Sequence, residues 1–112
     1  MSTIELTPDN FSQQFAQPGI VFLDFWAEWC APCLRFGPVF EAASEKNSDI
    51  IFGKIDTESQ QQLAADANIT SIPMLMAFRD GKLVFSQPGA ISASAFDGVI
   101  AAVRDLDMAT IK

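Results

Sequence analysis

The sequence contains no histidine, no tyrosine and only two cysteines, Cys30 and Cys33. A structural zinc ion usually needs four ligands from cysteine and histidine, and this chain offers only two of them. The shortage excludes a zinc site built by one chain and leaves only a metal or cluster shared between two chains. We therefore expect no bound metal.

Positive charge and long apolar runs are also scarce. Seven basic residues stand against fourteen acidic ones, so the net charge is −7. This charge repels nucleic acid phosphates and anionic membrane surfaces, and we expect neither nucleic acid nor membrane as a partner. No apolar run approaches the roughly 18 residues of a membrane span, and residues 1–5 form no basic leader. These absences predict a cytoplasmic protein.

What the chain does contain is enough apolar sequence for one core. It has 112 residues, of which 49% are hydrophobic, and no repeat, linker or low-complexity tract interrupts them. These properties are typical of a single folded domain. We expect one domain that covers residues 1–112 and acts as a monomer.

Both cysteines lie in the segment Trp29–Cys33, with the sequence Trp-Cys-Ala-Pro-Cys, just after the apolar run at 21–26. Residues three apart on a helical turn are about 5–6 Å apart, within the Cα separation of about 4.4–6.8 Å that a disulfide tolerates. If a helix begins near Cys30, its first N–H groups point toward that sulfur and stabilise a thiolate. Pro32 suits a first helical turn because its missing N–H leaves no hydrogen bond unmade. The segment predicts a reversible dithiol–disulfide couple.

Two other interpretations of the cysteine pair remain open. A structural disulfide between Cys30 and Cys33 closes a loop of about four residues, which on the chain-entropy model stabilises the fold by roughly 2 kcal/mol, compared with about 3 kcal/mol for a 15-residue loop. A half-site for a shared metal has the same spacing. As a redox couple, Cys30 attacks a substrate disulfide as a thiolate, and Cys33 then attacks Cys30 and releases the reduced substrate.

The hydrophobic pattern predicts alternating strands and helices. Strands are expected at residues 4–6, 21–26, 50–55, 74–78 and 83–86. Helices are expected at residues 7–17, 32–47 with a kink at Pro38, 59–67, and from 93 onward. The alternation favours parallel strands joined by right-handed crossovers, while Asp80–Gly81 favours a tight hairpin between the last two strands. The chain is predicted to be an α/β protein with a mixed sheet.

Asp24 is a carboxylate within the otherwise apolar strand predicted at 21–26. Aspartate is rarely buried without a partner. One interpretation is a general base whose pKa is raised by desolvation and which takes the proton of Cys33 as that residue becomes a nucleophile. The other is a structural aspartate that is ion-paired with a lysine or bound to neighbouring backbone. Lys54, in the adjacent predicted strand, is a candidate partner in both cases.

Several short motifs occur in a fixed order and spacing along most of the chain. They are Asp24–Cys33, Pro38, Lys54–Asp56, Ile72–Pro73 and Gly89–Ala90. In this set the chain resembles the thioredoxin family from about Thr3 to Leu106. The resemblance implies a thioredoxin-like three-layer α/β/α sandwich with a central mixed five-stranded sheet and four helices. It also implies a protein-disulfide reductase, supports the general-base role of Asp24, and implies a separate thioredoxin reductase as the source of electrons.

The resemblance further implies a substrate groove around the cysteines. In thioredoxins the bond that corresponds to Ile72–Pro73 is cis and faces the two cysteines, where it holds an extended substrate strand and keeps metals off the thiols. The residues expected to contact protein substrates are Trp29, Ala31, Pro32, Ile72, Pro73, Gly89 and Ala90. The chain departs from the commonest family pattern at Ala31, Leu34 and Pro88, and these departures bear on redox potential and partner choice.

These features favour a thiol–disulfide oxidoreductase that reduces protein disulfides through Cys30 and Cys33, with no bound cofactor beyond its own disulfide. The alternative is a thioredoxin-fold binding module or chaperone subunit that acts independently of redox chemistry. An oxidant or isomerase is a third candidate, but those proteins resemble a Cys-x-His-Cys pattern, whereas Ala31 and Pro32 separate the cysteines here. Without a histidine to stabilise the Cys30 thiolate, the reduced form is less favoured and the protein is a better reductant.

Overall fold

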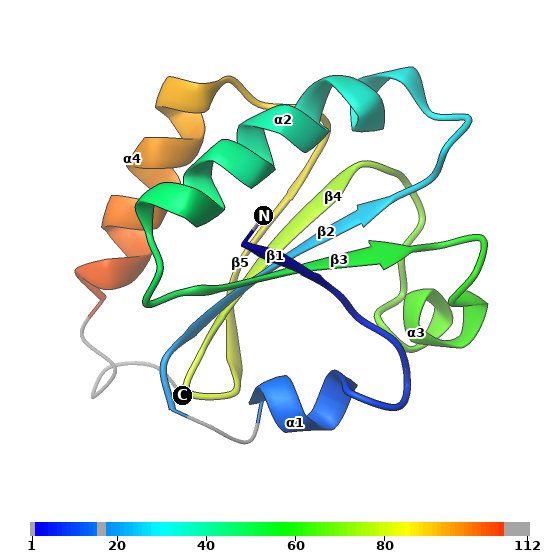
Figure 1. Cartoon of the computed structure of the whole chain (residues 1–112), viewed down its shortest axis with the longest axis horizontal. Coiled ribbons are helices and arrows are strands. Elements are labelled where there is room, and N and C mark those ends of the chain that lie inside the picture. The colour runs from blue at the N-terminus through cyan, green and yellow to red at the C-terminus, as the bar shows by residue number, and fades with distance from the viewer. Residues whose placement is uncertain (1, 16–17, 107–112) are drawn as a thin grey trace.

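A computed structural model describes residues 2–15 and 18–106 of the chain (Figure 1). Within these ranges the strands are β1 (Thr3–Glu5), β2 (Ile20–Trp26), β3 (Ile51–Asp56), β4 (Met74–Arg79) and β5 (Lys82–Pro88). The helices are α1 (Phe11–Phe15), α2 (Ala31–Lys46), α3 (Gln61–Asp66) and α4 (Ala93–Arg104). None of these helices combines the length and the apolar character that crossing a membrane requires.

The strands form one sheet in the order β1-β3-β2-β4-β5. β3 runs parallel to β1 and β2, whereas β4 runs antiparallel to β2 and β5. The connections explain the change of direction. The chain crosses from β2 to β3 through α2, while β4 and β5 meet in a tight turn at Asp80 and Gly81, which both have positive φ (52° and 82°). The predicted mixed five-stranded sheet is confirmed, with β2 at its centre.

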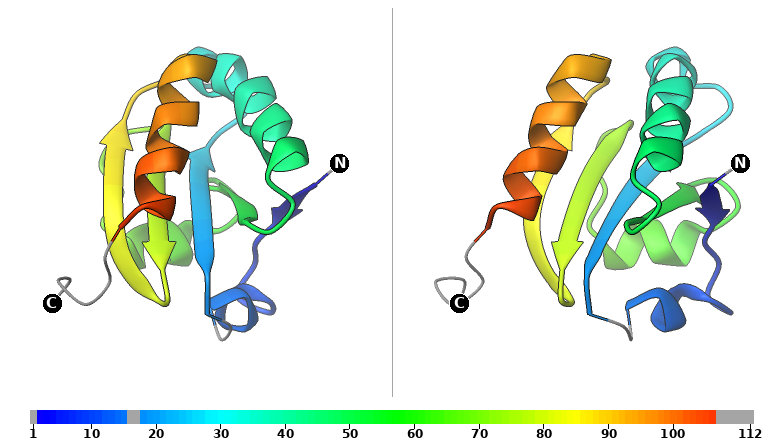
Figure 2. Two further views of the ribbon diagram at one scale, coloured as in Figure 1. Left: turned by 90° about the vertical axis from the view of Figure 1, so that its left-hand side faces the viewer. Right: turned by 60° about the vertical axis from the view of Figure 1, so that its left-hand side comes forward.

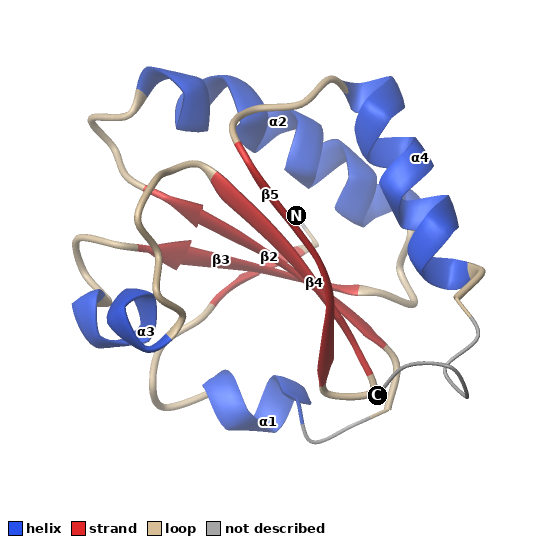
Figure 3. Ribbon diagram, turned by 180° about the vertical axis from the view of Figure 1, so that it is seen from behind, coloured by secondary structure: helices blue, strands red, loops and turns tan. Residues whose placement is uncertain are grey.

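Helices cover both faces of this sheet. α2 and α4 lie side by side on one face, and α1 and α3 lie on the other, as Figures 1 and 2 show and as Figure 3 shows from behind. Beneath α2 and α4, Phe22 and Phe52 stack with ring centroids 5.7 Å apart, and Phe40 and Phe96 stack at 5.9 Å. The buried side chains on the opposite face are Leu6, Val21, Leu23, Phe25, Ile55 and Met76. The predicted three-layer sandwich is therefore confirmed.

The first helix is shorter at its start than the sequence predicts. The sequence predicts Thr7 as the N-cap and Pro8 as the first helical residue, whereas α1 begins at Phe11. The reason is that the Asn10 side chain bonds the backbone ahead of it. Asn10 Oδ1 accepts a hydrogen bond from the N–H of Thr7 at 2.8 Å, and Asn10 Nδ2 donates to the carbonyl oxygen of Glu5 at 3.0 Å. Such side-chain bonds compete with helical ones and favour a turn. The predicted end of this helix, Gln17, lies outside the described residues.

The third helix is also shorter than predicted, for a similar reason. Asp56, the last residue of β3, accepts hydrogen bonds through Oδ1 from the N–H groups of Glu58 at 2.9 Å and Ser59 at 3.4 Å. These bonds form a turn where the sequence predicts helix from residue 59, and α3 begins at Gln61. Aspartate favours this kind of local bond to the backbone.

The connection between β2 and α2 places the cysteine segment at one end of the sheet. β2 ends at Trp26 and α2 begins at Ala31, so both cysteines lie where the central strand passes into the first turn of a helix. α2 continues through Pro38, and the kink expected at that residue stays a prediction. The site is thus mounted on two rigid elements and the short loop that joins them.

Candidate active site

Cys30 and Cys33 form a disulfide across the first turn of α2, with their Cα atoms 5.2 Å apart. Cys30 is the N-cap residue of the helix and has an extended backbone (φ −95°, ψ 104°). The N–H of Cys33 donates a hydrogen bond to Cys30 Sγ at 3.2 Å, and the N–H of Leu34 donates to the carbonyl oxygen of Cys30 at 3.1 Å. The Cys30 sulfur therefore occupies the place that a serine, threonine or aspartate oxygen usually takes at a helix start.

This capping position determines the chemistry open to Cys30. The start of a helix carries partial positive charge, and the Cys33 N–H already points at the Cys30 sulfur. The same contact stabilises a Cys30 thiolate once the disulfide is reduced. Cys30 and Cys33 are 5% and 2% exposed, whereas the neighbouring Trp29 is 70% exposed. Cys30 is the more exposed residue of the pair, and Trp29, with its large apolar side chain, directly precedes it in the chain.

Asp24 is the fifth of the seven residues of β2, two before the end that leads to α2, and is fully buried. It shares the α2 face of the sheet with Phe22, because residues two apart on a strand point to the same side. Neither carboxylate oxygen has a hydrogen-bond partner within the described part of the chain. Burial raises the pKa of Asp24 to about 7, and the positive charge of Lys54 offsets part of this rise. The site thus contains a carboxyl group that can hold or release a proton near neutral pH.

Lys54 is the cross-strand neighbour of Asp24, since β2 and β3 pair with these two residues in register. No ion pair joins their side chains within the described ranges. The ammonium group of Lys54 instead lies 4.8 Å from the centre of the Trp26 ring, within the reach of a cation–π interaction. The structure brings Lys54 to the site, and the contact it forms there is with an aromatic ring.

Two loops carry the predicted groove residues that follow β3. The Ile72–Pro73 peptide bond is cis, as the resemblance implies. The Ile72 side chain packs against the buried cluster that contains both cysteines. The N–H of Gly89 donates to the carbonyl oxygen of Pro73 at 2.8 Å, and Gly89 has a φ of 88°, which glycine adopts most readily. The loops at residues 73 and 89 are thereby tied together.

The predicted groove residues differ in how far they reach solvent. The exposed members are Trp29, Ala31, Gly89 and Ala90, the half-buried ones are Pro32 and Ile72, and Pro73 is buried. Four of these residues are therefore open to direct contact with a partner, and the groove itself stays a prediction.

A hollow of about 390 Å³ lies between Trp29 and the chain that follows α3. The residues that line it are Trp29, Thr57, Ala64, Ile69, Thr70, Ser71 and Ile72. Sequence reasoning identified Trp29 and Ile72 and missed the rest. No pattern in the sequence marks them, because α3 and the end of β3 reach Trp29 only through the fold.

Trp26 is a second residue of the site that the sequence analysis does not single out. Its ring lies under the Lys54 ammonium group and against the cluster that contains the cysteines. Its carbonyl oxygen accepts hydrogen bonds from the N–H of Thr57 at 2.9 Å and from Thr57 Oγ1 at 3.1 Å. Trp26 is in register with Asp56 on β3, so Lys54, two residues earlier on that strand, is its diagonal neighbour on the same face of the sheet.

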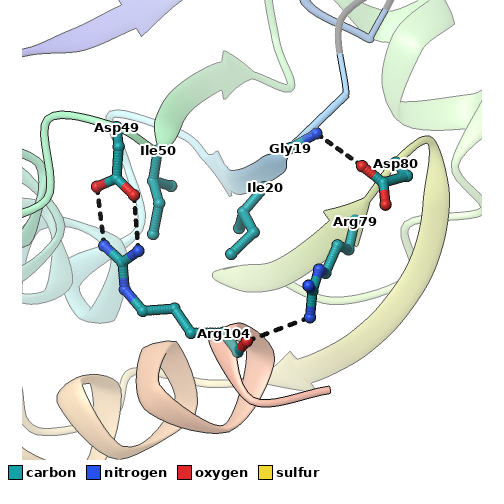
Figure 4. Close-up of a pocket in the computed structure, with 7 residues that line it drawn as sticks. All are labelled: Gly19, Ile20, Asp49, Ile50, Arg79, Asp80 and Arg104. Atoms are coloured by element: carbon teal, nitrogen blue, oxygen red, sulfur yellow. Dashed lines mark hydrogen bonds and ion pairs between the residues drawn. The ribbon is translucent and has the colours of Figure 1, made fainter. Parts of the chain in front are cut away.

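A further hollow, of about 280 Å³, lies at the opposite end of β2 (Figure 4). Arg104 donates to both carboxylate oxygens of Asp49 at 2.6 and 2.9 Å, and Arg79 donates to backbone carbonyl oxygens at the end of α4. Asp80 Oδ1 accepts a hydrogen bond from the N–H of Gly19 at 2.8 Å. The charged groups of this hollow hold the ends of neighbouring elements together. None of the predicted site residues lies here.

The described residues contain no group of three or more His, Cys, Asp or Glu side chains that could hold a metal ion. What the cysteine end of the sheet contains is a disulfide with a helix start directed at one sulfur, and a buried carboxyl group with a pKa raised to about 7. It also has an exposed tryptophan beside a hollow. This arrangement can exchange disulfides with a polypeptide bound against it.

The thioredoxin family model matches residues 2–102 of the chain. A Streptomyces coelicolor protein that carries the name putative thioredoxin 2 is 50% identical over 111 residues, which are 99% of this chain and 83% of that protein. Among solved structures, the thioredoxin of Malassezia sympodialis has a TM-score of 0.81 at 30% identity and covers 91% of this chain and 93% of its own. The thioredoxin of Plasmodium falciparum has a TM-score of 0.82 at 31% identity and covers 89% and 98%.

The matched region includes the central sheet and the cysteine pair, which has the two-residue spacing of a redox-active disulfide. The similarity to thioredoxins extends over nearly the whole chain in both sequence and structure. It supports disulfide oxidoreductase chemistry and does not favour a binding module that acts independently of redox. The chain therefore belongs to the thioredoxin family and is a thiol–disulfide oxidoreductase.

Proposed function

We propose that the chain reduces disulfide bonds of other proteins, with Cys30 as the nucleophile and Cys33 as the resolving cysteine. The Cys30 thiolate attacks one sulfur of the substrate disulfide, whose S–S bond breaks, and the other substrate sulfur leaves and takes up a proton. Cys33 then loses its proton and attacks Cys30 Sγ, which breaks the bond to the substrate. Two electrons pass from the dithiol to the substrate, and the Cys30–Cys33 disulfide is the oxidised product.

The observation that carries this assignment is the hydrogen bond from the Cys33 N–H to Cys30 Sγ at the start of α2. A donor already directed at one sulfur stabilises negative charge on that sulfur and not on the other. Cys30 is also the more exposed of the two. These two facts support Cys30 as the first nucleophile.

Asp24 is proposed as the general base that accepts the proton of Cys33. Three features support this role: its complete burial on the face that α2 covers, its two carboxylate oxygens without partners among the described residues, and its pKa near 7. A base works best when its pKa lies near the working pH. Lys54 is proposed to limit the rise of that pKa through its positive charge.

The groove is proposed to hold an extended segment of the substrate protein across the disulfide. Trp29 offers apolar area to the bound segment, and the small residues Ala31, Gly89 and Ala90 let its backbone approach closely. Ile72 and Pro73 are proposed to line the groove beside Gly89, which donates a hydrogen bond to the carbonyl oxygen of Pro73. The hollow beside Trp29 accepts one substrate side chain.

A separate thioredoxin reductase is proposed to return the disulfide to the dithiol, because the catalytic cycle leaves the chain oxidised and its chemistry uses no bound cofactor. The proposed location is the cytoplasm. A couple that must spend part of its cycle as free thiols suits a reducing compartment. Fractionation of the source cells with an antibody against the chain tests this location.

Insulin reduction tests the function directly. The reduced chain, thioredoxin reductase and NADPH are mixed with insulin, and NADPH oxidation is recorded together with the turbidity of the released B chain. We expect both signals to depend on the chain and to vanish in the Cys30→Ser/Cys33→Ser double variant. A wild-type chain no more active than the double variant would contradict the proposal. Rescue of a deficient strain by the double variant would point to the redox-independent binding role instead.

A further inference from the structure

Asp24 and Lys54 occupy directly opposed positions on neighbouring strands yet do not pair. β2 and β3 are adjacent beneath α2 (Figure 1), and the two residues are in register. Neighbouring strands are about 4.8 Å apart, so a lysine could reach across to this carboxylate. Buried carboxylates are usually paired when a cation is this close. In the described residues no ion pair is present at Asp24 and both of its oxygens lack a partner. Something holds the ammonium group elsewhere.

The position of the Lys54 ammonium group is defined by two contacts. It lies 4.8 Å from the centre of the Trp26 ring. It also lies near α2, because a Cβ atom built on Gly37 would be 3.9 Å from Lys54 Nζ, which is an ordinary van der Waals contact. The ammonium group is therefore close to both the indole ring and the helix.

The other charged groups on this face are engaged elsewhere. Glu41, one turn beyond Gly37 on α2, feels the charge of Lys54, but its carboxylate accepts hydrogen bonds from Thr3 Oγ1 at 2.6 Å and from the N–H of Ser2 at 3.1 Å. Asp56, the next β3 residue on the same side as Lys54, bonds its own turn at Glu58 and Ser59. β4 presents the apolar Leu75 opposite Asp24. Trp26 is thus the group on the sheet that holds Lys54.

We propose that Trp26 is a positioning residue for disulfide exchange, whose indole ring holds the Lys54 ammonium group near Asp24 but out of contact with it. This inference rests on the proposed role of Asp24 as the base for Cys33. A contact ion pair would fix Asp24 as a carboxylate and make it a weak proton acceptor. A charge held at the ring acts on Asp24 through space alone, so the carboxyl group keeps a proton affinity suited to neutral pH.

The test is the titration of Asp24 in the oxidised protein, followed by carbon-13 NMR of the side-chain carboxyl. Using the oxidised form removes the thiol titrations. In wild type we expect a midpoint near pH 7. In Trp26→Leu the ammonium group is freed to pair with Asp24, and the acid dissociation constant of that carboxyl is expected to rise about tenfold or more. A midpoint that is unchanged or higher in Trp26→Leu would overturn the proposal.

A double-variant cycle separates the charge effect from loss of packing. Lys54→Met removes the cation, and in that background Trp26→Leu is expected to leave the Asp24 midpoint where Lys54→Met alone puts it. If the Trp26→Leu shift persists without Lys54, Trp26 acts through packing and the proposal fails. Trp26→Phe retains a ring of similar shape with weaker attraction for a cation, so it covers the case in which Trp26→Leu does not fold. Its midpoint is expected to move in the same direction by less, and a midpoint equal to or above the wild-type value would contradict the proposal.

The pH profile of turnover supplies a second readout. Turnover of reduced protein with a peptide disulfide is recorded against pH. The part of this curve that follows the titration of Asp24 is expected to move to lower pH in Trp26→Phe, by the same amount as the NMR midpoint. A structural defect lowers turnover at every pH without moving the midpoint of the curve. The general-base role of Asp24 and the positioning role of Trp26 can be contradicted independently. Full activity of Asp24→Asn would show that Asp24 is not the general base. The NMR midpoints in oxidised protein would still show whether Trp26 holds Lys54 away from Asp24.

Discussion

The charged groups near the two ends of the central strand β2 differ in whether they have hydrogen-bond partners among the described residues. At the end where β2 begins, Arg104 holds Asp49 through two hydrogen bonds, and Asp80 holds the N–H of Gly19 (Figure 4). At the end where β2 passes toward α2, the buried carboxyl of Asp24 has no partner within the described residues. About six residues of strand, or roughly 20 Å, separate the two ends. The hydrogen bonds at the first end hold neighbouring elements together, and the proposed proton transfer takes place at the end that contains Asp24.

The difference between the two ends is also seen in the pKa values of two aspartates, Asp49 and Asp24. Hydrogen bonds and the charge of Arg104 lower the pKa of the exposed Asp49 to about 2, whereas burial raises the pKa of Asp24 to about 7. Both begin from the same ordinary value of 3.8. A partner group stabilises the charged form, and desolvation without a partner stabilises the neutral form. This fold thus retains an unpaired carboxyl at the one end where proton transfer serves the proposed reaction.

The largest expected effect comes from removing the nucleophile. Cys30→Ser is expected to lower kcat/KM for insulin reduction by at least about a thousandfold, because a serine hydroxyl is a far weaker nucleophile than a thiolate. Arg104→Met, at the opposite end, is expected to stay within about twofold of wild type. Equal losses in the two variants would show that the division between the ends of the sheet is wrong.

Asp24→Asn is expected to have the next largest effect, with opposite signs on activity and stability. Turnover should fall about tenfold or more because the proposed base is gone. The folded-state pKa of about 7 lies above the unfolded value of 3.8, so the contribution of Asp24 to wild-type stability is greatest below pH 3.8, falls as pH rises toward 7, and is flat beyond. The variant is expected to lack this contribution to the slope and to be more stable at pH 7 by up to about 4 kcal/mol, at about 1.4 kcal/mol per pKa unit.

Urea melts from pH 3 to pH 8 check the second half of that prediction. The matched control is Asp97→Asn, an exposed aspartate on α4 whose substitution is expected to leave the slope in place. An Asp24→Asn variant less stable than wild type at pH 7 would indicate an aspartate whose charge supports the fold. Asp24 and Asp49 would then contribute to stability in the same way, through their charged forms.

Asp49→Asn is expected to have a smaller effect with the reverse pH dependence. Because the pKa of Asp49 is lowered in the folded state, its contribution to stability is present above pH 3.8 and is lost as pH falls toward 2. Thermal melts should show a slightly lower midpoint for the variant at pH 7, with the difference shrinking in high salt. Insulin reduction is expected to be unchanged. A loss of activity in Asp49→Asn would show that the end of the sheet at Asp49 influences the chemistry at the cysteines.

The smallest expected effect concerns partner choice at the exposed leucines. Leu34 is 55% exposed one turn after Cys30, and Leu83 is 52% exposed near the hairpin at the other end. Leu34→Lys is expected to speed reaction with an acidic partner about two- to threefold at low ionic strength, with the gain shrinking as salt is added. Leu83→Lys serves as the matched control and should show no such gain. Identical stopped-flow rates for both variants across a salt series with several partners would exclude Leu34 from partner choice.

Much of the fold follows from local patterns in the sequence. The apolar run ending at Trp26 predicts a central strand, and the tight turn at Asp80–Gly81 predicts the antiparallel pair that makes the sheet mixed. Helix starts are harder to predict. At Asn10 and Asp56 a side chain bonds the backbone and the helix begins two or three residues later than predicted, and such bonds depend on a geometry that spacing does not reveal.

The site divides in the same way. The cysteine spacing predicts the disulfide, and Asp24 stands out as the one charged residue of its strand, so local sequence identifies both. The contact between Trp26 and Lys54 cannot be identified in this way, because it depends on the register of two strands that are separated by a whole helix. Ala64 and Ile69 reach the hollow beside Trp29 for a similar reason. Residues that join the site through register or packing leave no local signal in the sequence.

The most direct test of the account is to trap the intermediate of the exchange. The reduced Cys33→Ser variant is incubated with a disulfide-containing protein, quenched in acid and analysed by peptide mass spectrometry. The account predicts a stable mixed disulfide between Cys30 and the substrate, because the resolving thiol is missing, and no adduct in the matched Cys30→Ser variant. A stable adduct through Cys33 in Cys30→Ser, with none through Cys30 in Cys33→Ser, would contradict the central claim that the helix start makes Cys30 the nucleophile.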